Sequence, residues 1–235
     1  MNTLRQIKSL IHPTVKRLVK LRKDRNFRLK EGRAVVLGQK LCAELGPYIK
    51  EIFSSEPADD ATLVTHEILK KIAGVPAPDQ KAAEVALPEQ TDLTSAERLL
   101  ICDNIQDPGN LGTLIRTALA FHFDGVVLLP GCVDIFNEKV IRSSKGACFK
   151  LPHSFQSLKS LPHTLYYGDL TGTPLLEISA KPPFALIVSN EGSGPSPDVH
   201  KQAIPVTIPM HDLAESLNVA VAGSIMMHHL GGAHA

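Results

Sequence analysis

The chain has 235 residues, of which 43% are hydrophobic, so it can bury a full core arranged in one or two domains. No apolar run reaches the roughly 18 residues that a membrane-spanning helix needs, and we expect a soluble protein without a membrane partner. The four cysteines form no CxxC pair and the histidines lack zinc spacing. This pattern predicts reduced, mostly buried thiols in a cytoplasmic protein without a metal site.

The net charge of +1 conceals a strong asymmetry along the chain. Residues 1–33 hold eleven Lys and Arg against two acidic residues, a local charge of +9, whereas residues 34–235 carry −8. Such a basic block favours a polyanion as partner. A mitochondrial transit peptide is the alternative, because these peptides are also basic. The block contains Pro13 and continues directly into a segment that is typical of folded protein, so we favour the polyanion.

The first part of the chain is typical of a small α/β unit. Its predicted elements are a basic helix over 15–30, a strand over 33–38, a helix over 39–49, and a strand followed by a helix over 61–74. Residues 75–95 are rich in Pro, Gln and Asp, and we expect a final strand there followed by a linker. We therefore predict a basic α/β domain at 1–86, a linker at 87–95 and a second domain at 96–235.

Strands and helices alternate in the second domain. The predicted strands cover residues 98–104, 124–130, 164–170, 184–190 and 205–210, and the predicted helices begin at residue 111 and cover 137–147 and 216–230. Because helices between strands return the chain for parallel pairing, this order predicts an α/β fold with a mostly parallel sheet and helices on both faces.

Ligands of such sheets gather at the carboxyl ends of the strands. Three of these ends carry polar, loop-forming residues: "CDNIQDPGNLG", "SNEGSGPSP" and "IPMHDLAESLN". These three loops are the candidate site.

In the first loop, Asn110 is a favoured N-cap type for the following helix. A helical side chain leans over the residue four positions back, and for Arg116 that residue is Gly112, which offers no obstruction. The guanidinium can therefore lie beside the free backbone N–H groups and form an anion site suited to a phosphate. An ion pair of Arg116 with Asp103 or Asp107 is an equally good interpretation.

The second and third loops carry further candidates. Gly192 and Gly194 follow a strand, but they do not complete the GxGxxG fingerprint of dinucleotide-binding proteins, and turn formation alone could explain them. Glu191 beside them is the functional candidate. Ser216 and Asn218 precede the last helix, where helix capping is their simplest role.

Taken together, the loops resemble a known family. "NLGTLIRTA", "SNEGSG" and "IPMHDLAESLNVAVA" are similar, in order and spacing, to the three motifs of the SpoU/TrmH family of RNA 2'-O-ribose methyltransferases, part of the SPOUT superfamily. "KVIRSSKGACFKLP" matches a further family segment. The N-terminal half resembles the substrate-binding domain of such enzymes, in "VKRLVKLRKDRNFR" and "THEILKKIAG".

The resemblance implies a fold and an activity. The C-terminal segment is expected to form a trefoil knot that binds S-adenosyl-L-methionine, and the protein is expected to be a homodimer. The expected reaction is methylation of a ribose 2'-hydroxyl in structured RNA, with ribosomal RNA favoured because this domain type accompanies rRNA-modifying members. The alternatives are a tRNA 2'-O-methyltransferase and a non-catalytic RNA-binding protein.

The resemblance also implies site residues. Arg116 aligns with the family's catalytic arginine, and Glu191 is expected to fix Asn110 or the turn of the second motif. The full catalytic set is Arg116, Asn110, Glu191, Ser216 and Asn218, and the cofactor-binding set is Ser189, Glu191, Gly194, Ile208, Met210, Leu217 and Asn218. Ser189 stands where the family usually has glycine, so the backbone there must be extended for serine to be tolerated.

The basic block then supplies phosphate contacts that position RNA without reading its sequence. The predicted RNA-binding residues are Lys16, Arg17, Lys20, Arg22, Lys23, Arg25, Arg28 and Arg142. Aromatic side chains amount to 5% of the chain with no Trp, so we expect recognition of RNA shape more than base stacking.

Overall fold

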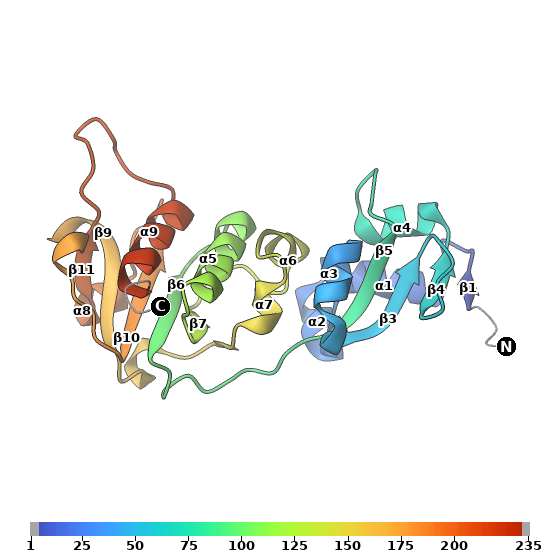
Figure 1. The fold of residues 1–235 in the computed structure, drawn as a ribbon, viewed down its shortest axis with the longest axis horizontal. Helices are drawn as coiled ribbons and strands as arrows, with labels where there is room; N and C mark the ends of the chain where they lie inside the picture. The colour runs from blue at the N-terminus through green and yellow to red at the C-terminus, as the bar shows by residue number, and fades with distance from the viewer. Residues whose placement is uncertain (1–4, 232–235) are drawn as a thin grey trace. The chain divides into compact units, whose positions relative to one another are not determined.

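The structure is a computed structural model that describes residues 5–231, and within them the chain divides into two compact units (Figure 1). The first unit runs to Pro88 and includes Phe136–Arg142, and the second comprises Glu89–Ile135 and the chain from Ser143 onward. Leu93, which we predicted to lie in a linker, is buried in the core of the second unit. The linker is therefore shorter than predicted, because an apolar side chain gains by joining the nearby core.

The first unit holds a five-stranded mixed sheet in the order β1-β4-β3-β5-β2, in which β5 is antiparallel to β2 and β3. Its elements are β1 (Gln6–Ile7), α1 (Pro13–Lys23), α2 (Arg25–Glu31), β2 (Arg33–Leu37), α3 (Gln39–Glu44), β3 (Ile49–Ser54), β4 (Ala61–Val64), α4 (His66–Ala73) and β5 (Lys81–Ala86). The α/β character and the final strand, β5, are as predicted.

Two boundaries in this unit differ from prediction. The basic helix is two helices, because Asp24 leaves helical geometry and its carboxylate caps α2 by accepting from the Phe27 N–H at 3.0 Å. Helix α3 ends at Glu44, and a 3₁₀ turn over Gly46–Tyr48 leads into β3, a strand that we did not predict. Gly and Pro at this point disfavour a longer helix.

The second unit holds a six-stranded sheet in the order β11-β9-β10-β6-β7-β8, and every pair of neighbouring strands is parallel. Its strands are β6 (Arg98–Asp103), β7 (Gly125–Leu128), β8 (His153–Ser154), β9 (Thr164–Pro174), β10 (Phe184–Ser189) and β11 (Ile204–Thr207). Its helices are α5 (Pro108–Ala120), α7 (Ala147–Lys150), α8 (Pro197–Gln202) and α9 (Val219–Gly231). This confirms the predicted α/β fold with a parallel sheet, while the trefoil knot stays a prediction.

Helices cover both faces of this sheet. Successive strand residues point to opposite faces. Ile187 on β10 belongs to the core cluster that contains Val199 of α8. The next residue, Val188, faces α9, where a Cβ added to Gly223 would lie 3.1 Å from Val188 Cγ1 and 2.5 Å from Leu114 Cδ2. A glycine at position 223 therefore lets α9 pack closely against both β10 and α5.

Helix α5 begins earlier than predicted, and this changes the role of Asn110. Asp107 is the N-cap, with its Oδ1 accepting from the Asn110 N–H at 2.8 Å, and Pro108 occupies the first helical position. The prediction that Asn110 caps the helix is therefore wrong. Its side chain lies in the first turn and is available for another contact.

The segment predicted as one helix over 137–147 is also divided. Helix α6 (Glu138–Ser143) and α7 are separated by Lys145 and Gly146, which both have positive φ angles of 51° and 77°. Helices cannot continue through such left-handed residues.

All four cysteines are unpaired, and three of them are buried, which agrees with the predicted reduced thiols. Burial raises the pKa of Cys42 to about 11. No helix within residues 5–231 is both long enough and apolar enough to cross a membrane.

Candidate active site

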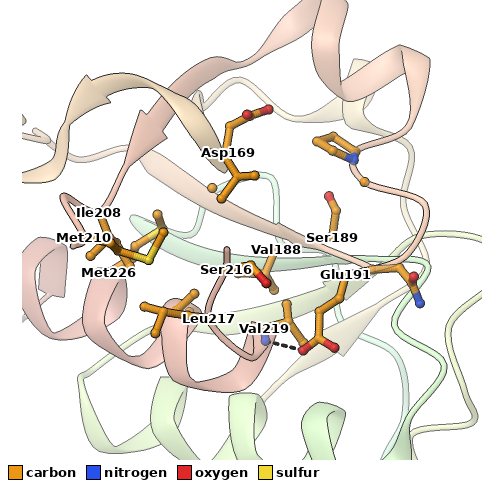
Figure 2. Close-up of a pocket in the computed structure, with 17 residues that line it drawn as sticks. Asp169, Val188, Ser189, Glu191, Ile208, Met210, Ser216, Leu217, Val219 and Met226 are labelled. Carbon is orange, nitrogen blue, oxygen red and sulfur yellow. Dashed lines mark hydrogen bonds between the residues drawn. The ribbon is translucent and has the colours of Figure 1, made fainter. Parts of the chain in front are cut away.

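A cavity of about 260 Å³ lies in the second unit beside the ends of β10 and β11 (Figure 2). Val188 and Met226 contribute apolar surface from β10 and α9, and Asp169 contributes a carboxylate from β9. Six of the seven residues predicted to bind the cofactor line this cavity: Ser189, Glu191, Gly194, Ile208, Met210 and Leu217. The loops of the second and third motifs thus share one cavity, and the predicted catalytic residue Ser216 lines it as well.

Asn218 joins the first motif to the third. Its Nδ2 donates to Asn110 Oδ1 at 3.1 Å, and its Oδ1 accepts from the N–H groups of Ala220 and Val221 at 3.0 and 3.3 Å. One side chain therefore caps α9 and holds the first turn of α5. Because an amide carries both a donor and an acceptor, Asn can serve both contacts and Asp cannot.

Glu191 connects the second motif to the third. Its Oε1 accepts from the Val219 N–H, the first residue of α9, at 2.5 Å (Figure 2). We predicted instead that Glu191 would fix Asn110 or the turn of its own loop. A carboxylate at a helix N-terminus is stabilised by the free N–H groups and the helix dipole, which explains its actual partner.

Ser189 ends β10 in strand geometry and is not among the described non-glycine residues with positive φ. Serine in place of the family's glycine therefore causes no backbone strain. Its hydroxyl donates to Asp103 Oδ2 at 3.1 Å. Gly194, in contrast, has a φ of 64°, a conformation that favours glycine.

Arg116 stands apart from these contacts. It is exposed on α5, lies in the third turn because the helix begins at Pro108, and is not a lining residue of the cavity. Within residues 5–231 its guanidinium forms no hydrogen bond or ion pair. The alternative ion pair with Asp103 or Asp107 is not formed; Asp107 accepts instead from the Asn110 N–H, and Asp103 accepts from two serines. Arg116 is therefore open to an external anion.

Sequence reasoning missed several lining residues. Gly168 and Asp169 lie within β9, and Met226 lies on α9. A Cβ added to Gly168 would lie 3.2 Å from Met226 Cε, so the glycine leaves room at the cavity wall. Only the small residues of the last helix gave any signal of close packing there.

The basic residues of the first unit divide into two groups. Arg28 is 3% exposed and donates to the carbonyls of Leu21 and Arg22, so it cannot contact RNA and is left out of the predicted RNA surface. Arg17 forms a two-pronged ion pair with the buried Glu84, and hydrogen bonding to Glu84 raises the pKa of Arg17.

Arg22 is also engaged, in an ion pair with Glu138 at 3.3 Å. We therefore assign Arg17 and Arg22 to the stability of the fold. The remaining predicted contacts are exposed: Lys16, Lys20, Lys23, Arg25 and Arg142.

Known proteins resemble this chain in both sequence and structure. Residues 97–228 match the model of the SpoU rRNA Methylase family. The chain is 36% identical over 250 residues to the 23S rRNA (guanosine(2553)-2'-O)-methyltransferase RlmP of Bacillus subtilis, with 97% of this chain and 100% of that protein covered. The chain belongs to the SpoU rRNA methylase family. The family that the three motifs predicted is thereby confirmed.

Solved structures agree with the fold. A putative RNA methyltransferase of the TrmH family from Porphyromonas gingivalis is 30% identical, with a TM-score of 0.81 over 94% of this chain and 98% of that one. An AdoMet-bound rRNA methyltransferase from Sinorhizobium meliloti gives a TM-score of 0.84 at 23% identity, covering 96% of each chain. At that identity the likeness bears on the fold alone.

The double role of Asn218 leads to a prediction on stability. Asn218→Asp retains the acceptor that caps α9 but loses the donor to Asn110, whereas Asn218→Ala loses both. We expect the Ala variant to lose about 1 kcal/mol of unfolding free energy in urea denaturation, and the Asp variant to stay within about 0.5 kcal/mol of wild type. Equal losses in the two variants would contradict a capping role.

Proposed function

We propose that this chain transfers a methyl group from S-adenosyl-L-methionine to a ribose 2'-hydroxyl of ribosomal RNA. The observation that carries the proposal is that the second and third motif loops line one cavity of a SpoU family member and are tied by the Glu191–Val219 bond. The bond between Asn218 and Asn110 attaches the first motif to the third. The likeness to a 23S rRNA 2'-O-methyltransferase over that protein's full length supports the substrate class.

The cavity residues fit the methyl donor. Ile208, Leu217 and Met226 supply apolar surface for an adenine ring, and polar groups of Ser189 and Glu191 stand at its edge. Binding sites for such molecules combine an apolar wall with a few fixed polar groups. When bound, S-adenosyl-L-methionine supplies a methyl group already activated by a positively charged sulfur.

The residues of the chain then position the acceptor ribose. A 2'-hydroxyl is a weak nucleophile until its proton leaves, so positioning and stabilisation of the oxyanion are the main needs. Asn110 and Asn218, fixed against each other, orient the ribose. The exposed Arg116 binds the phosphate of the target nucleotide and stabilises the developing negative charge. A guanidinium keeps its proton, so Arg116 is not the base, and we leave the proton acceptor unassigned.

We further propose that the active form is a homodimer. Val221 and Ile225 on α9 and Leu119 on α5 are large apolar side chains that are between 38% and 48% exposed, on two helices that pack together. Burial of such a face against a second copy is favourable. A dimer also allows the exposed Arg116 of one copy to act at the cavity of the other.

Replacement of Arg116 tests the catalytic part of the proposal. Arg116→Lys keeps the charge but loses the planar fork that grips a phosphate. We expect this variant to lose at least about tenfold in turnover and Arg116→Ala about 100- to 1000-fold. The measurement is incubation of total RNA with labelled S-adenosyl-L-methionine, followed by mapping of 2'-O-methyl positions by reverse transcription.

Arg5→Lys, a change on an exposed ion pair in the first unit, is the matched control and should retain wild-type turnover. Normal turnover of Arg116→Lys would contradict the assigned role. Methylation found only in tRNA would show that tRNA, and not ribosomal RNA, is the substrate. Absence of both methylation and donor binding would favour a non-catalytic RNA-binding protein.

The exposed lysines of α1 give a prediction on RNA binding. Each phosphate contact contributes about 0.7–0.9 to the slope of log Kd against log salt concentration. The triple variant Lys16→Gln, Lys20→Gln, Lys23→Gln should therefore weaken RNA binding and reduce this slope by about 2.

A second triple variant in the other unit, Lys159→Gln, Lys181→Gln, Lys201→Gln, removes the same charge from exposed positions. We expect it to leave the slope within about 0.5 of wild type. The measurement is a filter-binding titration at several salt concentrations. If the two triple variants had equal effects, RNA binding would depend on net charge alone, which would contradict a defined RNA surface on α1.

A further inference from the structure

The loop that follows β10, residues 190–196, is anchored at both ends by one residue of the neighbouring strand. Asp103 Oδ2 accepts from the Ser189 hydroxyl at 3.1 Å, just before the loop, and from the Ser196 N–H at 2.8 Å, at its end. The main-chain oxygen of Asp103 also accepts from the Asn190 N–H at 3.1 Å. We call residues 190–196 the donor loop.

Asp103 is held tightly in place. It is only 3% exposed, and within the described residues its carboxylate forms no ion pair and accepts only from neutral donors. A buried carboxylate is costly unless it is hydrogen-bonded, so the bonds to Ser189 and Ser196 are strongly favoured. The carboxylate thus fixes the distance between the two ends of the donor loop.

Contacts inside the donor loop make its shape depend on its ends. Asn190 Oδ1 accepts from the N–H groups of Gly192 and Ser193, and the Asn190 carbonyl accepts from the Gly194 N–H. Glu191 and Gly194 of this short loop line the cavity. A shift of either end therefore moves the groups that face the methyl donor.

We propose that Asp103 is a positioning residue of the methyl-donor site, acting through Ser189 and Ser196 rather than by contact with the donor. The proposal rests on the proposed function. The proposal also assigns a role to Ser189. Its hydroxyl donates a hydrogen bond to Asp103 that glycine, the family's usual residue, cannot form.

The test is the affinity for S-adenosyl-L-methionine in isothermal calorimetry. Loss of one such hydrogen bond should raise Kd about three- to tenfold in Ser189→Ala and Ser189→Gly. Asp103→Asn keeps one acceptor oxygen and should raise Kd about tenfold, and Asp103→Ala should raise it further. Ser160→Ala, which removes an exposed hydroxyl bonded to the Ser157 carbonyl, is the matched control and should keep the wild-type Kd.

A double-mutant cycle separates positioning from independent effects. Because Ser189 acts through Asp103, Ser189→Ala should change Kd less than twofold in the Asp103→Ala background. The full three- to tenfold loss in that background would overturn the proposal. So would an unchanged Kd in Ser189→Ala and Asp103→Asn.

Two further readouts exclude general loss of structure. Asp103 does not line the cavity, so in the Asp103 variants KM for S-adenosyl-L-methionine should rise while kcat at saturating S-adenosyl-L-methionine stays within about twofold. The affinity of these variants for RNA, measured without S-adenosyl-L-methionine, should be unchanged, because the exposed lysines of α1 lie in the other unit. A fall in kcat with unchanged KM would contradict a positioning role.

The outcomes also separate this inference from the proposed function. If the wild-type chain binds no S-adenosyl-L-methionine, the proposed function and the inference both fail. If the wild type binds and all four variants bind equally well, only the role of Asp103 fails.

Discussion

The parallel pairing of β6 with β10 is the constraint on which the site depends. Its register sets Asp103 opposite Ser189, so the first and second motifs leave the sheet side by side at the same edge. Hydrogen bonds then complete the arrangement: Glu191 reaches the start of α9, and Asn218 reaches back to Asn110. Three loops that are far apart in the sequence are joined because neighbouring strands present their carboxyl ends together. The cavity follows from this junction.

Arginine and lysine side chains have different roles in the first unit. In the first unit, arginines provide the structural contacts: Arg28 binds main-chain carbonyls and Arg17 neutralises the buried Glu84. Arginine suits such sites because its planar fork satisfies several acceptors at once. The lysines of α1 (Lys16, Lys20 and Lys23) stay exposed, and Lys20 lies over the Phe27 ring at 4.4 Å without losing access to solvent. The basic segment that composition indicates is therefore partly structure and partly surface available to RNA.

The sequence predicted most strands of the second unit well, because short runs of aliphatic residues bounded by polar loops are typical of buried strands. Through the resemblance of the motifs it also predicted the lining residues from the second and third motif loops, but not those from β9 or from the body of α9. It could not predict which of two good caps starts α5, since Asp107 and Asn110 are equally suitable types and tertiary contacts decide. Nor could it show that Arg28 is buried while the nearby lysines are exposed. Arg28 is buried because it donates to two main-chain carbonyls at the end of α1, and helical spacing alone does not predict that contact. The role of Asp103 could not be predicted either, because it depends on the register that places Asp103 opposite Ser189, and that register is known only from the structure.

The central claim is that the loops at 189–195 and 208–219 hold one methyl donor. Hydrogen exchange measured by mass spectrometry, with and without S-adenosyl-L-methionine, tests it directly. The account predicts slower exchange in both segments together on addition of the donor, with exchange in the first unit unchanged. Exchange that is unaffected in either segment, or protection confined to the first unit, would contradict it.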